Sequence, residues 1–308
     1  RMNLPFKIQP SFQAFRASFY IHIISIILYI TLFGNFSLIH SGYFALTYII
    51  VSIVLENFLI SYKKKEEQRG SEINILKDQE IYRREFLGNV SHELKTPLFT
   101  IQGYILTLIE GAVKDNKVRG KYLNRTAKGV DRIISIVKDL DLITQFESGI
   151  KTVDKSNFNI YELVDNVYEL MEFESEKNNT KLRIRNERNN SVMVYADNER
   201  ILQVLTNLVV NSIKYGKENG YTEIAVDEYN KDRIIVKVLD DGEGIEEEHI
   251  PRLFERFYRI DKTRSRKKGG SGLGLSIVKH IIEAHQEQIF VKSIVGEGTE
   301  FSFTLSKS

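Results

Sequence analysis

Two long apolar stretches within the first 60 residues limit what this chain can fold into. Residues 18–34 carry no charged side chain, and residues 38–60 carry only Glu56. Each stretch is close to the length of about 20 apolar residues that a helix needs to cross a bilayer. A signal peptide is the alternative for the first stretch, but it lacks a small-residue cleavage site and a second apolar stretch follows directly. The pattern therefore predicts a membrane α-hairpin of two helices.

Basic residues flank this hairpin but are missing from its connection. Lys7 and Arg16 precede the first stretch, residues 63–69 hold three lysines and one arginine, and residues 35–37 hold no basic residue. Because basic flanks stay on the cytoplasmic side, both ends of this multi-pass segment are expected in the cytoplasm, with lipid as a partner. The connection is too short for an extracellular ligand-binding domain, so the stimulus is expected to be read in the membrane, at its surface or through a partner.

Three ionisable side chains, His22, His40 and Glu56, lie within the apolar stretches. Such groups are costly at membrane depth and often functional, so proton or metal sensing is one hypothesis and a position near the interfaces is the other. The chain begins at Arg1 rather than at methionine, which leaves the completeness of its N-terminus open.

The overall composition excludes several functions. The chain has no cysteine, which excludes disulfides, cysteine-ligated zinc and thiol nucleophiles. Its 43 basic and 41 acidic residues leave a net charge of +2, and this balance gives no reason to expect nucleic-acid binding. Its 308 residues suggest two or three modules, at about 100–200 residues per domain.

A highly charged stretch follows the hairpin. Residues 62–85 are rich in lysine, glutamate, glutamine and arginine, with sparse apolar positions, and are expected to form a helical signalling linker. A solvated linker is the alternative, but the stretch has no proline and a single glycine, Gly70, which favours a continuous helix.

The segment FLGNVSHELKTP at residues 86–97 places a histidine on an amphipathic helix. At about 100° per residue its apolar side chains gather on one face, and His92 falls almost opposite them. An idle surface histidine is the alternative, but Glu93 can hold one imidazole nitrogen and leave the other as a nucleophile. The zinc motif H-E-x-x-H is excluded because its fifth position is Thr96. Pro97 is expected to kink the helix.

A second helical pattern, from Tyr122 to Phe146, follows a break at residues 111–116. Two antiparallel helices with this apolar stripe cannot bury it alone. The pattern therefore predicts a homodimer in which two helical hairpins form a four-helix bundle over residues 86–150.

From residue 151 to 308 the pattern changes again. Short β-like runs at residues 191–196, 224–226 and 233–239 alternate with helical patterns, which indicates an α/β sandwich. Asp197 is the predicted N-cap of one of these helices.

Asn207 and Asn211 lie one helical turn apart in this region. Asn211 can offer a carbonyl oxygen to Mg²⁺, and Lys214, beside Tyr215, can bind phosphate. Surface polar positions are the alternative reading of both amides.

Two glycine-rich segments lie further along the chain. Asp240 precedes Gly242 and Gly244, where the glycines allow close backbone approach and the carboxylate can accept from an adenine amino group. Residues 269–275, GGSGLGL, open an apolar helix whose amides can hold phosphate, although the lysine of a Walker A loop is absent. Between these two segments, residues 254–259, FERFYR, lead into a basic stretch that includes Arg264 and that can close over a polyphosphate or remain a solvated loop.

In this order, over residues 80–308, the segments resemble the H, N, G1, F and G2 boxes of sensor histidine kinases of two-component systems, with HisKA and HATPase_c modules. The pattern is most similar to phosphate-sensor (PhoR-like) kinases, but it leaves no room for their PAS sensor or HAMP linker. The resemblance implies the ATP-binding sandwich of gyrase, chaperones, histidine kinases and MutL. It also implies a bacterial inner membrane location, ATP and Mg²⁺ as cofactors, and the receiver domain of a response regulator as partner.

The resemblance also implies roles for the histidine segment. His92 would be the phosphoacceptor, from which an aspartate of the response regulator is phosphorylated, and Glu93 its acid–base partner. Thr96 would orient water when the phosphorylated regulator is dephosphorylated, so a phosphatase activity is expected as well.

The nucleotide site follows from the same resemblance. Asn211, with Asn207 near it, would serve Mg²⁺–ATP, with Asn211 as the metal ligand, and Asp240 would read adenine. ATPases of this fold place a glutamate where Asn207 stands, so a kinase is favoured over an ATPase or an inactive scaffold. The remaining residues expected to shape the nucleotide pocket and its lid are Lys214, Tyr215, Gly242, Gly244, Arg264, Gly270, Gly272, Leu273 and Gly274.

Overall fold

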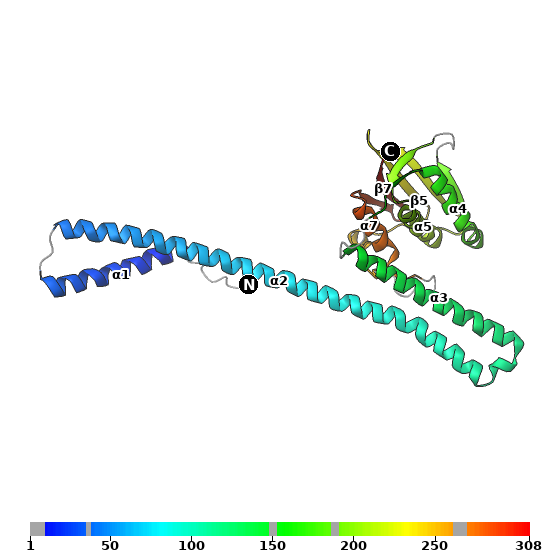
Figure 1. Cartoon of the computed structure of the whole chain (residues 1–308), viewed down its shortest axis with the longest axis horizontal. Coiled ribbons are helices and arrows are strands. Elements are labelled where there is room, and N and C mark those ends of the chain that lie inside the picture. The colour runs from blue at the N-terminus through cyan, green and yellow to red at the C-terminus, as the bar shows by residue number, and fades with distance from the viewer. Residues whose placement is uncertain (1–9, 35–37, 148–152, 186–190, 261–269) are drawn as a thin grey trace. The chain divides into compact units, whose positions relative to one another are not determined.

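The computed structural model of the chain describes residues 10–34, 38–147, 153–185, 191–260 and 270–308. The chain divides into two compact units, Arg1–Glu85 and Phe86–Ser308 (Figure 1).

The first unit holds two apolar helical segments. Helix α1 spans Pro10–Phe33, and helix α2 spans Leu38–Ile109, so that its first part belongs to this unit. Within them the apolar spans are Arg16–Phe33, with mean hydropathy 1.6, and the one that begins at Gly42, with mean hydropathy 1.9. By length and composition alone, both are suited to crossing a membrane. The connection at residues 35–37, on which the expected topology depends, lies outside the described residues.

His22 lies buried between α1 and α2. Its Nδ1 is 3.1 Å from the Ser18 carbonyl oxygen, and its Nε2 is 3.1 Å from Thr47 Oγ1. Both ring nitrogens therefore have partners, as buried polar groups generally do. Glu56 is partly exposed, and the side chain of His40 lies outside the described residues.

Helix α2 continues as one α-helix through residues 62–85 and on to Ile109, which confirms the expected continuous helix there. Pro97 lies inside it and does not end it, although proline removes one helical hydrogen bond. Two hydroxyls act as additional donors nearby: Thr96 Oγ1 to the His92 carbonyl at 3.3 Å, and Thr100 Oγ1 to the Thr96 carbonyl at 2.9 Å. The predicted kink at Pro97 thus does not divide α2 into two helices.

A helical hairpin opens the second unit. The short 3-10 helix η1, Ala112–Lys114, follows α2 and leads into α3, Asn116–Glu147, so the expected break between two helices is confirmed. The two helices approach closely at Gly129, where an added Cβ would lie 2.7 Å from Ile101 Cγ1. A larger residue at position 129 would have to push α2 and α3 apart.

The rest of the second unit contains two β-sheets. The larger sheet has the strand order β2-β4-β5-β7-β6, with β2 parallel to β4 and the other pairs antiparallel. Its strands are β2 Lys181–Arg185, β4 Tyr221–Glu228, β5 Arg233–Asp240, β6 Ile289–Ile294 and β7 Gly298–Ser306. The smaller sheet pairs β1, Ser156–Asn159, with β3, Met193–Ala196, in antiparallel fashion.

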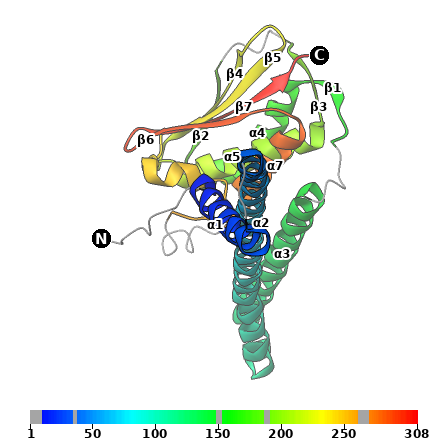
Figure 2. The same ribbon diagram turned by 90° about the vertical axis from the view of Figure 1, so that its left-hand side faces the viewer.

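Three helices cover one face of the larger sheet (Figure 2). They are α4 Ile160–Lys177, α5 Asn198–Tyr215 and α7 Gly274–Ala284, while the 3-10 helix η2 spans Glu247–Arg252. Strand β5 alternates along its length, with Ile234, Val236 and Val238 buried. The predicted α/β sandwich is therefore confirmed, and Asp197 caps α5 by accepting from the Arg200 backbone N–H at 3.1 Å.

The end of α3 belongs to the core of this sandwich. Leu142 and Ile143 are buried in the same apolar cluster as the sheet and its helices, and Phe146 packs against that cluster. Helix α3 also contacts α7. Burying a leucine or isoleucine side chain contributes about 1.5–3 kcal/mol, so these contacts hold the sandwich on its own α3.

Candidate functional site

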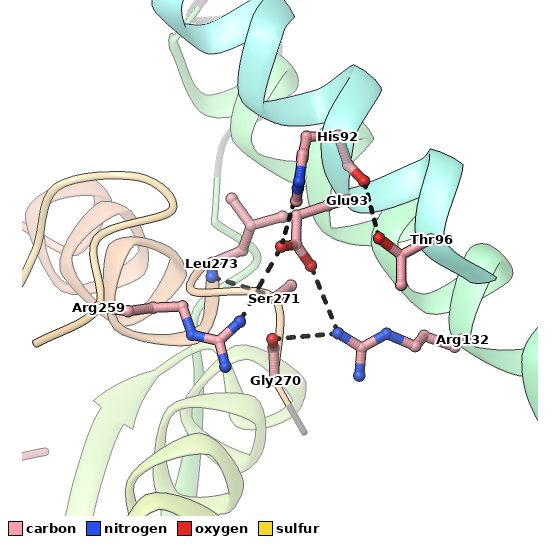
Figure 3. Close-up of polar contacts among 8 residues, drawn as sticks. All are labelled: His92, Glu93, Thr96, Arg132, Arg259, Gly270, Ser271 and Leu273. Carbon is pink, nitrogen blue, oxygen red and sulfur yellow. Dashed lines mark hydrogen bonds and ion pairs between the residues drawn. The ribbon is translucent and has the colours of Figure 1, made fainter. Parts of the chain in front are cut away.

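His92 lies on the solvent side of α2, as the helical pattern predicts (Figure 3). Its side chain is 58% exposed, and its Nδ1 lies 4.0 Å from Glu93 Oε1. This separation is longer than a hydrogen bond, but catalytic hydrogen bonds are often long before substrate binds and shorten in the reacting complex. Thr96 lies one turn further along and donates to the His92 carbonyl oxygen.

Two arginines from other elements meet Glu93. Arg132 of α3 places Nη2 3.4 Å from Glu93 Oε2, and Arg259, in the segment after η2, places Nη1 4.0 Å from Glu93 Oε1. The Glu93 side chain is only 19% exposed. Partly exposed pairs contribute roughly 0–1 kcal/mol each, so their main effect is to orient the carboxylate beside His92. Neither arginine is among the site residues predicted from the sequence.

Arg132 also reaches the glycine-rich loop that precedes α7. Its Nη2 donates to the Gly270 carbonyl oxygen at 3.1 Å (Figure 3). Gly272 has φ +76° and an added Cβ there would lie 2.8 Å from Phe257 Cα, so only glycine suits this position. The Phe257 N–H donates to the Gly272 carbonyl at 2.9 Å. The loop is thus held between α3 and the segment that carries Phe257.

That segment also contacts the part of α2 that leads to His92, at Phe86. The Phe86 and Phe257 rings have centroids 6.0 Å apart, and the Arg256 guanidinium lies 5.0 Å from the Phe86 ring centroid. Aromatic and cation–π contacts of this kind add to apolar burial. The catalytic sandwich and the histidine-bearing helix therefore meet through several independent contacts.

The predicted phosphate-binding residues of α5 lie beside the same loop. A Cβ at Gly274 would lie 3.6 Å from Asn207 Oδ1, and a Cβ at Gly270 would lie 2.5 Å from Lys214 Nζ. Asn211 is half-buried on the same helix. The structure therefore brings Asn207 and Lys214 to the loop, at the N-terminal end of α7, where backbone amides favour an anion.

Asp240 ends strand β5, and two backbone donors hold its carboxylate. Oδ1 accepts from the Gly242 N–H at 2.9 Å and from the Thr299 N–H at 3.2 Å, so both of these hydrogen bonds fall on the same carboxylate oxygen. Burial raises the pKa of Asp240 to about 6, against the two backbone hydrogen bonds, which lower it. A Cβ at Gly242 would lie 2.6 Å from the Tyr215 carbonyl oxygen and 2.7 Å from Asp240 Oδ1, so a side chain there would clash with the end of α5 and with this carboxylate.

Tyr215 connects this end of the site with the arginines. Burial raises the pKa of its phenol, and the positive charge of Arg259 opposes that rise. The Lys214 ammonium lies 4.9 Å from the Tyr215 ring centroid. Arg259 is therefore within electrostatic range of both Glu93 and the nucleotide-binding side of α5.

Leu273, Gly244 and Arg264 are the remaining residues predicted for the nucleotide pocket. Leu273 is fully buried in the core, so only its backbone can contact a nucleotide, and its N–H already lies 3.3 Å from Ser271 Oγ. Gly244 has φ +73° and lies in the loop after β5. Arg264 lies outside the described residues.

The modules of the chain match two known families. Residues 82–149 match the His Kinase A (phospho-acceptor) domain, and residues 196–308 match the Histidine kinase-, DNA gyrase B-, and HSP90-like ATPase family. With a solvent-facing histidine in the first module and the glycine loops in the second, the chain belongs to the sensor histidine kinases of two-component systems. The predicted family is therefore confirmed.

Among individual relatives, the chain is similar to the sensor histidine kinase WalK of Bacillus subtilis (strain 168). The two are 37% identical over 229 residues, which cover 74% of this chain and 37% of the length of that kinase. Among solved structures, the Acinetobacter baumannii histidine kinase AdeS aligns with a TM-score of 0.56 at 27% identity, covering 70% of this chain and 97% of that one. Histidine kinase ThkA in complex with the response regulator protein TrrA aligns with a TM-score of 0.58 at 29% identity, covering 80% and 66%.

Proposed function

We propose that this chain is a membrane sensor histidine kinase that autophosphorylates His92 with Mg²⁺–ATP and passes the phosphoryl group to an aspartate of a response regulator. One observation carries the proposal. Glu93, next to His92, lies 3.4 Å from Arg132 and 4.0 Å from Arg259, and Arg132 also binds the glycine loop at Gly270. The nucleotide-binding loop and the phosphoacceptor thus share one cluster of contacts.

The position of Glu93 beside His92 supports different roles for the two imidazole nitrogens. Nδ1 faces Glu93, so Nε2 carries the free lone pair and attacks the γ-phosphorus. The N–P bond forms as the bond from phosphorus to the ADP oxygen breaks, and that electron pair leaves with ADP. Glu93 then accepts the Nδ1 proton, which neutralises the charge on the phosphorylated ring.

The nucleotide side of the site has a matching set of groups. Asp240 Oδ2 accepts from the adenine amino group, Lys214 binds phosphate oxygens, and Arg259 neutralises charge on the transferred group. Asn211 would hold Mg²⁺, which supplies further charge neutralisation when bound. Asn207 replaces the glutamate of the related ATPases, so water has no base there and transfer to His92 is favoured.

The N-terminal part supports a membrane location. We assign residues 1–61 to an N-terminal tail and a hairpin of two membrane helices in the bacterial inner membrane, with both ends cytoplasmic, since both helices have the required length and hydropathy. Residues 62–85 form the signalling linker, residues 86–150 the phosphoacceptor hairpin, and residues 151–308 the ATP-binding domain.

Exposed apolar side chains on the helical hairpin support a homodimer. In the single chain they face solvent, and pairing two hairpins into a four-helix bundle would bury such a surface. The large exposed apolar residues of α2 and α3 in this region are Leu87, Leu98, Phe99, Ile105, Leu106, Ile109, Leu123, Val130, Ile134 and Val137. The ThkA structure, solved with a response regulator, supports a receiver domain as the second partner, and Thr96 is assigned to regulator dephosphorylation.

Incubating the full chain in detergent with γ-labelled ATP and Mg²⁺ tests the proposal. The wild type should acquire acid-labile, base-stable label, and His92→Gln should acquire none while still binding ATP with unchanged affinity. Label that survives in His92→Gln would overturn the assignment of His92. Steady phosphate release from the same variant would instead identify an ATPase, and ATP binding without any label in the wild type would identify a scaffold.

A further inference from the structure

The catalytic sandwich is tied to α3 of its own chain. Ile143 is fully buried and Leu142 is 7% exposed, both within the core of the sandwich. Ile136, two turns earlier, is 2% exposed. Because Ile136 and Ile143 are seven residues apart, they lie on one face of α3, and at Ile143 this face packs into the core of the sandwich.

Arg132 extends the same face by one further turn. It lies four residues before Ile136, so its side chain projects in the same direction. The close approach of α2 and α3 at Gly129, against Ile101, brings this part of α3 beside the histidine segment. Arg132 can therefore touch Glu93 on one side and the glycine loop on the other.

The contacts then continue, within a single chain, from the phosphoacceptor to the nucleotide site. Arg132 Nη2 lies 3.4 Å from Glu93 Oε2 and donates to the Gly270 carbonyl at 3.1 Å. Lys214 Nζ approaches Gly270 on the nucleotide side. One arginine thus links the acid–base partner of His92 with the loop that is expected to hold the phosphates.

We propose that each chain phosphorylates its own His92, and that Arg132 is the positioning residue that aligns the glycine loop with Glu93 for this transfer in cis. This inference rests on the proposed function. It adds that the phosphoryl group goes to the His92 of the same chain that binds the ATP. The bonds that form and break are the same as for transfer between chains. What supports transfer within one chain is that the sandwich, packed on its own α3 at Ile143, already contacts Arg132, which reaches Glu93 of the same chain.

Mixed dimers with two affinity tags test the cis assignment. One dimer combines a His92→Gln chain with an Asn211→Ala chain, so the kinase-competent and acceptor-competent halves sit on different chains. The other combines a wild-type chain with a chain carrying both substitutions. All are full-length proteins purified through both tags in sequence and incubated with γ-labelled ATP and Mg²⁺, next to the wild-type homodimer.

Transfer in cis predicts no label in the first mixed dimer and label on the wild-type chain of the second. Label on the Asn211→Ala chain of the first dimer, with none in the second, would overturn the cis assignment. Since the wild-type homodimer is labelled in both cases, this failure is distinct from failure of the proposed function, in which the homodimer itself stays unlabelled.

Arg132→Gln tests the positioning role, with Arg125→Gln as a matched control. Arg125 lies two turns earlier on α3, and its Nη1 is 3.3 Å from Tyr104 Oη. We expect Arg132→Gln to lower kcat for autophosphorylation about tenfold, because a hydrogen bond from a charged group has this order of effect. KM for ATP should change less than about twofold, Arg132→Lys should recover part of the rate, and Arg125→Gln should match wild type. An Arg132→Gln variant with wild-type kcat, or with a loss confined to KM, would overturn the positioning role.

Discussion

Replacing Asp240 with asparagine should stabilise the protein while impairing nucleotide binding. The Asp240 carboxyl is buried and its pKa is raised from 3.8 to about 6. A carboxyl group whose pKa is raised on folding destabilises the folded protein when it is ionised. The resulting loss in the free energy of unfolding is absent at low pH, where the group is protonated, and complete above pH 6. Asparagine keeps the Oδ1 that accepts from Gly242 and Thr299 but never ionises.

The size of this penalty follows from the shift. Each pKa unit corresponds to about 1.36 kcal/mol, so the penalty at pH 7.5 is at most about 3 kcal/mol and falls to roughly half of that at pH 5. For a domain of this size, about 3 kcal/mol raises Tm by roughly 6–12 °C. The same substitution removes the charged acceptor for the adenine amino group, which should weaken ATP binding by roughly 10- to 100-fold.

Thermal unfolding of the nucleotide-free full chain at pH 7.5 and pH 5, together with ATP titration, measures both effects. Asp241→Asn is the matched control, since Asp241 Oδ1 accepts from the Tyr221 N–H at 3.1 Å and lies next in the chain. It should change Tm and affinity little. A Tm for Asp240→Asn below that of wild type at pH 7.5, or a gain in Tm that does not shrink at pH 5, would show that ionised Asp240 does not destabilise the folded protein.

Further predictions concern helix packing, acid stability and the phosphatase. Gly129→Leu should separate α2 from α3 and lower the autophosphorylation rate at least about tenfold. Gly120→Leu, on the same helix, places its side chain in open space and should retain the wild-type rate. Equal autophosphorylation rates in the two variants would contradict this prediction. Burial lowers the pKa of His285, whose Nε2 accepts from the Asp197 N–H at 2.9 Å. The neutral His285 side chain therefore stabilises the fold fully above pH 6.5, and this stabilisation is lost as the pH falls further. His285→Gln should therefore flatten the loss of Tm between pH 7 and pH 5, and an unchanged slope would count against it. Thr96→Ala should slow dephosphorylation of the phosphorylated regulator, and an unaltered rate of phosphate release would remove Thr96 from that role.

Much of this architecture was predictable because it depends on local pattern. Apolar spacing predicted the hairpin of α2 and α3 and the exposure of His92, and the short β-like run at residues 233–239 predicted strand β5. Asp197 was recognisable as an N-cap because capping is decided within one turn. The expected kink at Pro97 was less informative, because a long helix can contain a proline without ending.

The contacts around Glu93 were not predictable in the same way. Arg132 is 39 positions and Arg259 is more than 160 positions away from Glu93 in the chain. Arg132 reaches Glu93 through the packing of α3 against α2, and Arg259 reaches it through the contact of the sandwich with the helical hairpin. Neither residue stands out in its local pattern, since exposed arginines are common on helices. Leu273 was predicted as a nucleotide-binding residue because it lies in a glycine motif, but its side chain belongs to the core.

Phosphorus-31 NMR of the chain after incubation with Mg²⁺–ATP, with proteolytic mapping of the phosphorylated peptide, tests the central claim most directly. Because Nδ1 of His92 faces Glu93 Oε1, we expect a single phosphohistidine, at His92, with phosphorus on Nε2. Phosphate on Nδ1 of His92, or on any other residue, would contradict it.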